Sequence, residues 1–128
     1  MGAFGGAGTQ GGLGSIEEHV ERFAGGLAFS DKRFVYVALL LYNANMGAPT
    51  KEDAAGWAKH FGMDRAKDRL VCVPAGDLRG DAAYNLIPGF QLIDGDFTLV
   101  ADSTGHAPKD DLYRTLLPML GLLCPKGK

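Results

Sequence analysis

The segment FVYVALLLYNANMGAPTKEDAAGWAKHF, residues 34–61, decides the fold class. Its opening run, 34–41, is almost continuously apolar and aromatic, which predicts a central strand covered on both faces. Thr50 and Asp53 have the spacing of a helix capping box, and apolar residues at helical spacing continue to Phe61. The segment therefore predicts a strand, a short loop and a helix from Lys51 to about Phe61.

Two further elements follow from the flanking sequence. Ser15 and Glu18 repeat the capping-box spacing, which predicts a helix from there to about Phe23. The apolar stretch from Arg69 to Val73 predicts a second buried strand. Because two buried strands joined through a helix form a right-handed crossover, we expect these two strands to be parallel.

The C-terminal third predicts a hairpin and a helix. Strands are expected at Phe90–Ile93 and Phe97–Ala101, since Asp94-Gly95 between apolar runs is a strong hairpin pattern. A last helix is expected from near Pro108, with a kink at Pro118. The complete order predicts an α/β fold with a mixed central sheet, a C-terminal β-hairpin and helices on both faces.

Length and composition exclude several classes of protein. The chain has 128 residues, 46% of them hydrophobic and 22% charged, which is typical of one globular domain. The net charge of −2 favours neither nucleic acid nor an anionic membrane as partner. The longest apolar run, 34–42, is too short for a membrane helix, which needs about 20 residues.

The N-terminal stretch 1–14 contains seven glycines and is expected to be a flexible tail, with the ordered domain at 15–128. Within it, residues 6–11 fit the dinucleotide-binding pattern GxGxxG. That pattern requires a strand directly before it, and too few residues precede Gly6 to form one. No cofactor is therefore expected. The stretch also lacks the basic and apolar regions of a secretory signal, and it assigns no compartment.

The cysteines and histidines suggest no reactive centre. Cys72 lies between two valines in a predicted strand and is expected to be a buried, inert thiol. Cys124 follows the last helix and is expected to be partly exposed, and the pattern does not decide whether the two pair. His19, His60 and His106 lie on three different elements without ligand spacing, so no metal site is expected. His19 and His60 are expected at the surface.

The stretch Ile87-Pro88-Gly89-Phe90-Gln91-Leu92-Ile93-Asp94-Gly95 carries a resemblance. With the element order, it resembles the thioredoxin superfamily over roughly residues 15–123, in the redoxin branch of thiol-disulfide oxidoreductase and peroxiredoxin relatives. Gln91 and Phe97 depart from the family pattern, which has phenylalanine and glycine there. The resemblance implies a thioredoxin-like fold and a cis bond at Pro88, beside the loop before the second helix.

That loop departs from the family at the reactive positions. Alignment to the thioredoxin Cys-x-x-Cys places Met46 and Pro49 at the cysteines. Alignment to the peroxiredoxin Cys-Pro-Thr places Ala48 at the peroxidatic cysteine. Thiol exchange requires an attacking thiolate, which neither alignment supplies. Leu40 stands where the family has a buried acid.

Two classes of function remain. In the first, the chain is a redox-inactive relative that binds an extended protein or peptide partner in a groove between the loop and the cis-proline. That groove would consist of Asn45, Met46, Gly47, Ala48, Pro49, Thr50, Ile87 and Pro88. Met46 would either contact the partner or pack against Pro88. In the second, the chain derives from a thiol or peroxide oxidoreductase whose cysteine has been substituted. The oligomeric state is left open.

Overall fold

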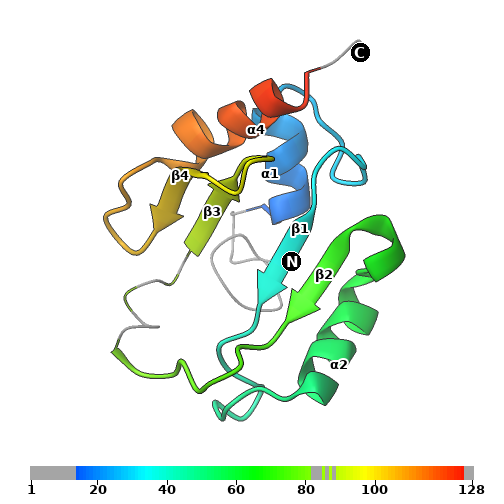
Figure 1. The fold of residues 1–128 in the computed structure, drawn as a ribbon, viewed down its shortest axis with the longest axis vertical. Coiled ribbons are helices and arrows are strands. Elements are labelled where there is room, and N and C mark those ends of the chain that lie inside the picture. The colour runs from blue at the N-terminus through cyan, green and yellow to red at the C-terminus, as the bar shows by residue number, and fades with distance from the viewer. Residues whose placement is uncertain (1–13, 82–84, 86, 88, 126–128) are drawn as a thin grey trace. The chain divides into compact units, whose positions relative to one another are not determined.

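The fold is described from a computed structural model, which places residues 14–81, 85, 87 and 89–125 (Figure 1). The tail expected at 1–14 lies almost wholly outside these residues. The chain divides into two compact units. We call residues 32–84 the parallel unit, and residues 1–31 together with 85–128 the hairpin unit.

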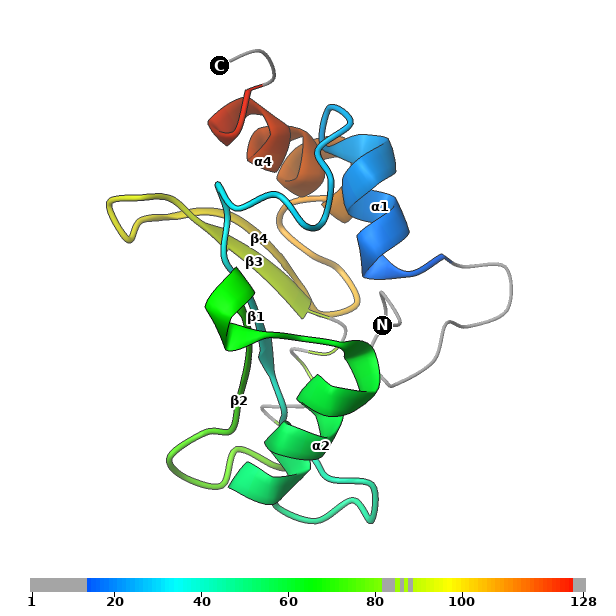
Figure 2. The ribbon, with the colours of Figure 1, turned by 90° about the vertical axis from the view of Figure 1, so that its right-hand side faces the viewer.

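The parallel unit contains β1 (Tyr36–Leu39), α2 (Lys51–Phe61), the short helix η1 (Arg65–Lys67) and β2 (Arg69–Cys72). The two strands pair in parallel, from Tyr36 with Arg69 to Leu39 with Cys72. The prediction of parallel strands joined through a helix is therefore confirmed. Figure 2 shows α2 beside these strands, and α2 packs against β2.

The burial predicted for the first strand is wrong. β1 spans only 36–39, and its residues alternate between half-buried and exposed. Val35, Val37 and Leu39 are 56%, 52% and 52% exposed. Side chains of a strand alternate between two faces, and in this unit α2 covers one face only. Both faces of β1 carry apolar side chains, but only the face that α2 covers is packed.

The hairpin unit contains α1 (Ile16–Phe23), β3 (Gly89–Ile93), β4 (Leu99–Thr104), η2 (Leu112–Leu116) and α4 (Leu117–Leu123). The capping box at the start of α1 is present in both directions between Ser15 and Glu18. β3 and β4 form the expected antiparallel hairpin, but β4 does not start at Phe97 as predicted, because the turn extends to Thr98. α1 packs against η2 and α4. The buried apolar residues of this unit include Ile16, Val20, Ala24, Leu27, Ala101, Leu112, Leu116, Leu117, Leu120 and Cys124.

The last helix differs from the prediction in its start and its form. It begins at Leu112 instead of near Pro108, and its first turn, η2, is a π-helix. The Asp111 carboxylate caps it by accepting from the backbone N–H groups of Tyr113 and Arg114 at 2.9 and 2.7 Å. Pro118 lacks an N–H and would clash with a carbonyl one turn before it. The turn directly before Pro118 is a π-helix, and the kink at Pro118 stays a prediction.

The described strands form two separate two-stranded sheets, one in each unit. The chain is thus a mixed α/β protein with small sheets and, among the placed residues, three α-helices. A single mixed sheet with helices on both faces remains a prediction. In the described part of the chain, no helix is long and apolar enough to cross a membrane.

Candidate functional site

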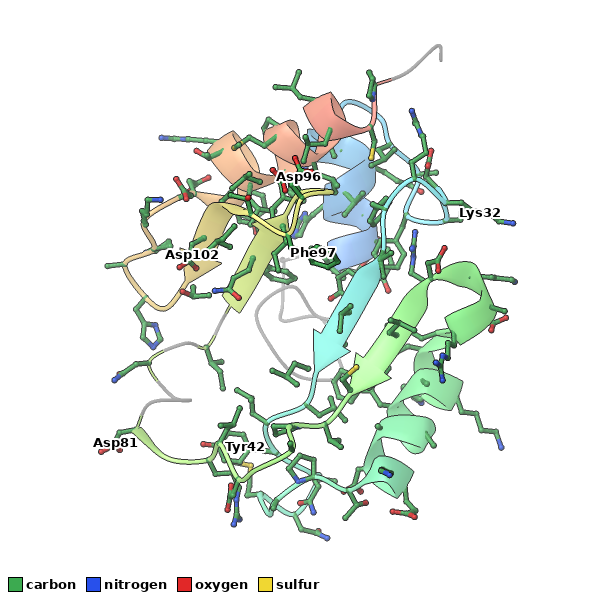
Figure 3. All side chains as sticks on the ribbon, in the orientation of Figure 1. Lys32, Tyr42, Asp81, Asp96, Phe97 and Asp102 are labelled. Carbon is green, nitrogen blue, oxygen red and sulfur yellow. The ribbon has the colours of Figure 1, made fainter. Side chains whose placement is uncertain are left out.

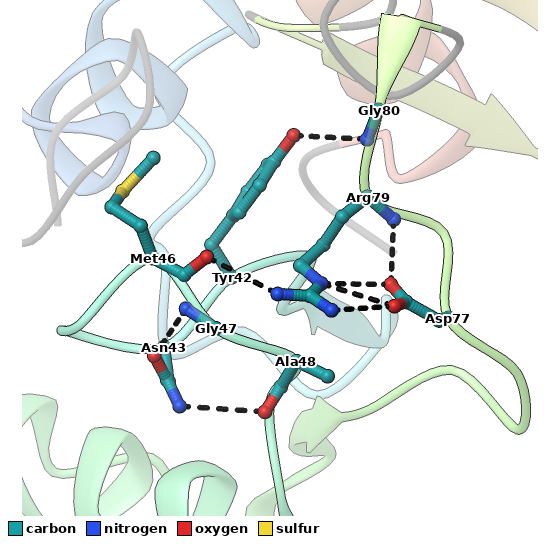
Figure 4. A network of polar contacts seen from close by, with 8 residues as sticks. All are labelled: Tyr42, Asn43, Met46, Gly47, Ala48, Asp77, Arg79 and Gly80. Atoms are coloured by element: carbon teal, nitrogen blue, oxygen red, sulfur yellow. Dashed lines mark hydrogen bonds and ion pairs between the residues drawn. The ribbon is translucent and has the colours of Figure 1, made fainter.

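The loop between β1 and α2 is organised by one side chain, that of Asn43 (Figure 4). Its Oδ1 accepts from the backbone N–H groups of Asn45 and Gly47 at 3.0 and 2.8 Å. Its Nδ2 donates to the carbonyl oxygen of Ala48 at 3.3 Å. The backbone N–H of Asn43 also donates to the Gly47 carbonyl at 3.0 Å. The loop therefore has a defined shape of its own.

Met46 is displayed at the turn of this loop. Its φ of 61° is left-handed, a conformation that costs a residue with a side chain about 1 kcal/mol or more. Its N–H donates to the Asn43 carbonyl at 3.0 Å, and its side chain is 68% exposed. Of the two interpretations of Met46, this exposure favours contact with a partner. The other, packing against Pro88, involves a residue that lies outside the described residues.

Residues 77–80 hold the loop in place by hydrogen bonds, and the sequence did not predict these contacts. Arg79 pairs with Asp77 through Nε and Nη2, with a shortest distance of 2.7 Å. Its Nη1 donates to the Met46 carbonyl at 3.4 Å, and the Gly80 N–H donates to the Tyr42 hydroxyl at 3.3 Å. The close Asp77–Arg79 spacing could have indicated the ion pair. A contact across more than 30 residues has no local signal.

The ion pair changes the acidity of the carboxylate. Side-chain hydrogen bonds from Arg79, and then its backbone N–H, lower the pKa of Asp77 from 3.8 to about 2. The same hydrogen bonds raise the pKa of Arg79. Asp77 and Arg79 therefore remain an ion pair at neutral pH.

The N-terminus of α2 is occupied by its own cap. Thr50 Oγ1 accepts from the Asp53 N–H at 3.2 Å, and Asp53 Oδ2 accepts from the Thr50 N–H at 2.7 Å. The helix begins at Lys51, so positions 46 and 48 lie in the loop before its first turn. Glu52 and Asp53 add negative charge at this end. The arrangement does not favour a thiolate at either position.

The predicted site residues are only partly brought together. Asn45, Met46, Gly47, Ala48, Pro49 and Thr50 lie consecutively in the loop and at the start of α2. Ile87 is half-buried and belongs to the other unit. Pro88 lies outside the described residues, so its cis bond stays a prediction. The groove that joins these two parts is untested.

The burial expected for both cysteines is reversed. Cys72 is exposed because it ends β2 on the same face as its partner Leu39, which α2 does not cover. Cys124 is only 5% exposed because it follows Leu117 and Leu120 on the buried face of α4. Among the described residues, no group of three His, Cys, Asp or Glu side chains could hold a metal ion.

His19 is less exposed than expected, whereas His60 is exposed as predicted. The His19 ring lies edge-on to Tyr113 at 5.0 Å and tilted to Phe23 at 6.0 Å, between centroids. Its Nε2 is buried and has no hydrogen-bond partner among the placed residues. Helical spacing alone could not predict this, because Tyr113 comes from a distant element. These contacts indicate a packing role in the hairpin unit.

Comparisons with protein-family models, with curated proteins and with solved structures find no match for this chain.

Proposed function

We propose that this chain is a redoxin-like protein of the thioredoxin fold that is redox-inactive and binds an extended peptide or protein partner through the loop Asn45–Thr50. The single mixed sheet and the cis-proline implied by the sequence resemblance belong to this proposal. The same resemblance adds Ile87 and Pro88 to the binding residues. No nucleic acid, metal or cofactor takes part.

The observation that carries the proposal is the display of Met46. A left-handed methionine, 68% exposed, stands on a loop held by Asn43 and by Arg79. A thioether adapts to many apolar partners, and a loop already ordered loses little entropy on binding. The loop therefore has the properties of a binding element and lacks a nucleophile.

The alternative is a thiol or peroxide oxidoreductase whose cysteine has been substituted at position 48, or at positions 46 and 49. Ala48-Pro49-Thr50 is the sequence that a cysteine-to-alanine change would leave. Against it stand the capping box that occupies the N-terminus of α2 and the acidic residues of its first turn. Both would leave a thiol at position 48 without the stabilisation that enzymes of this kind need.

Cysteine replacements distinguish the redox-inactive binding protein from the substituted oxidoreductase. Ala48→Cys and Met46→Cys are made in a Cys72→Ser background, and their alkylation rates by iodoacetamide are followed against pH. We expect both thiols to titrate near the ordinary value of about 8.5. Ala55→Cys, on the exposed side of α2, provides the reference thiol. A pKa of about 7 or below at position 48 would support the substituted enzyme instead.

Binding is tested with a displayed library of random peptides selected on the intact chain. We expect selected peptides to lose affinity about tenfold, near 1.4 kcal/mol, when Met46→Ala is introduced. Leu122→Ala, an exposed leucine on α4, is the matched control and should leave affinity unchanged. Selected peptides that bind the Met46→Ala protein as tightly as the original would contradict the proposed site.

A further inference from the structure

The turn of the β3–β4 hairpin has the same construction as the loop around Asn43. Asp94 Oδ1 accepts from the N–H groups of Asp96 and Thr98 at 2.8 and 3.0 Å. The Asp94 N–H donates to the Thr98 carbonyl at 2.9 Å, and the Phe97 N–H donates to the Asp94 carbonyl at 3.1 Å. Phe97 therefore occupies the position that Met46 has in the first loop, three residues after the organising side chain.

Phe97 adopts a strained backbone conformation, and its side chain is almost fully exposed in the described part of the chain. Its φ is 60°, in the left-handed region where glycine or asparagine is favoured. Its side chain is 92% exposed, and no ring contact is recorded for it among the described residues. Figure 3 labels Phe97 and Asp96 on this turn. A bulky residue at such a position indicates a role outside the folding of the hairpin.

The neighbouring side chains enlarge this feature into an apolar tip, which we define as Ile93, Phe97 and Leu99. Ile93 and Leu99 are cross-strand partners next to the turn, and they are 55% and 49% exposed. Cross-strand partners lie on the same face of a hairpin. The end of this short two-stranded sheet therefore carries three exposed apolar side chains, one in the turn and two on the strands beside it.

The charged residues that lie next to the tip along the chain are all acidic. Asp94 and Asp96 flank the apolar residues, and Asp102 follows in β4. The stretch 85–105 contains no lysine, arginine or histidine. A complementary partner would therefore carry positive charge. The acids disfavour an anionic membrane and a tip-to-tip contact between two copies of the chain.

A partner strand cannot pair with the central part of β4 through backbone hydrogen bonds. The N–H of Asp102 donates to Asp110 Oδ2 at 2.8 Å, and the Asp102 carbonyl accepts from the Asp110 N–H at 3.0 Å. Both backbone groups that face away from β3 at this residue are thus satisfied within the chain. A partner of the hairpin would use the side chains of its tip instead.

We propose that the hairpin tip is a docking surface that inserts Phe97 into an apolar pocket on a partner protein, with lysine or arginine side chains on the rim of that pocket facing Asp94 and Asp96. Buried aromatic anchors surrounded by polar contacts dominate many protein interfaces. This surface is separate from the loop Asn45–Thr50 and does not depend on the function proposed for it.

The probe is a displayed library of small helical proteins with randomised grooves, selected on the intact chain. We expect one class of binders to be enriched in arginine, lysine and apolar residues. Their affinity should fall at least about tenfold with Phe97→Gly. The same variant should unfold at a higher temperature, because glycine adopts the left-handed conformation without cost. Phe97→Asn, which also tolerates this conformation, should lose the binders equally.

Controls distinguish the tip from other surfaces. Leu122→Ala removes an exposed leucine elsewhere, and Glu21→Gln removes an exposed acid from α1, and both should leave binding unchanged. Asp96→Asn should weaken binding more at low than at high salt. Selection that yields no binders dependent on Phe97 would overturn the proposal. A second result would also overturn it: the chain binds phosphatidylcholine vesicles in a way that depends on Phe97, and the selection yields no basic groove. That result would assign the tip to a membrane.

Discussion

At the scale of single residues, the same five-residue loop occurs twice among the described residues. Asn43 and Asp94 each accept from backbone N–H groups two and four residues later. In each case the residue three positions on, Met46 or Phe97, is left-handed and exposed. A short side chain with an acceptor oxygen thus fixes a turn in which a large apolar residue points away from the protein.

The organising role of Asn43 predicts the effect of its removal. Asn43→Ala deletes hydrogen bonds to Asn45, Gly47 and Ala48, and we expect the free energy of unfolding to fall by about 1 kcal/mol. Amide hydrogen exchange at Gly47 should accelerate at the same time. Asn45→Ala is the matched control, because the structure uses only the backbone N–H of Asn45 in this loop. Equal exchange at Gly47 in both variants would show that the loop keeps its shape without Asn43.

The Asp77–Arg79 pair predicts a dependence on pH. The pKa of Asp77 in the folded state, about 2, lies below the ordinary 3.8, so the pair stabilises the folded form above about pH 4. That contribution is lost as the pH falls from about 4 to about 2. Because both groups are exposed, the effect on total stability is small.

The direct measurement is an NMR titration of the Asp77 carboxyl carbon. Arg79→Gln removes the charged donor, and the pKa of Asp77 should return toward 3.8. Arg65→Gln, in η1, removes a distant arginine and should leave the titration unchanged. If Asp77 titrates near 2 in the absence of Arg79, the assigned cause is wrong.

At the scale of secondary-structure elements, local sequence patterns correctly predicted the helix caps and turns that local contacts stabilise. The capping boxes of α1 and α2 formed where the sequence placed them, and the hairpin turns at Asp94 as expected. Each of these depends on residues within four positions of one another. Element type was therefore predictable from local spacing, whereas parallel pairing was predicted from the crossover of two strands through a helix.

One strand boundary differs because of a local turn, whereas the other differences depend on distant contacts. β4 begins at Leu99 because Phe97 is part of the turn, which hydrophobic alternation does not indicate. The half-exposed β1 depends on which faces other elements cover, and the link from Arg79 to Met46 joins two irregular segments. In the candidate site, sequence identified the loop residues but not the segment that fastens them.

The packing of α4 on α1 gives a prediction at this scale. A Cβ at Gly121 would lie 2.7 Å from the backbone carbon and oxygen of Ala24, atoms that cannot move without shifting a helix. Gly121→Ala should therefore lower the free energy of unfolding by about 1–3 kcal/mol. Chemical denaturation followed by circular dichroism measures this difference.

Gly56→Ala is its matched control. Gly56 is exposed within α2, and a Cβ there would meet no atom within 4 Å. Alanine is favoured over glycine in helices, so this variant should be more stable by up to about 1 kcal/mol. Two identical substitutions should thus have opposite effects. A neutral Gly121→Ala would mean that the two helices do not approach as closely as described.

At the scale of the whole molecule, the chain consists of two units, and the two cysteines belong to different ones. Cys72 is exposed at the end of a strand, and Cys124 is buried behind a helix. Titration with a coloured disulfide reagent should therefore show one fast thiol in the native protein and a second after unfolding. The Cys72→Ser protein should lack the fast phase.

This distribution predicts that the intact chain has no disulfide reductase activity. Turnover needs an attacking thiolate and a second thiol to release the mixed disulfide, and the loop before α2 contains neither. Cys72 and Cys124 are 52 positions apart and differ in access, so they do not form a vicinal pair. In an insulin-reduction assay with dithiothreitol, the rate should equal that of the buffer alone, for the original chain and for Cys72→Ser alike. A faster rate that disappears with Cys72→Ser would identify Cys72 as a reactive thiol and return the chain to the enzymes that its sequence resembles.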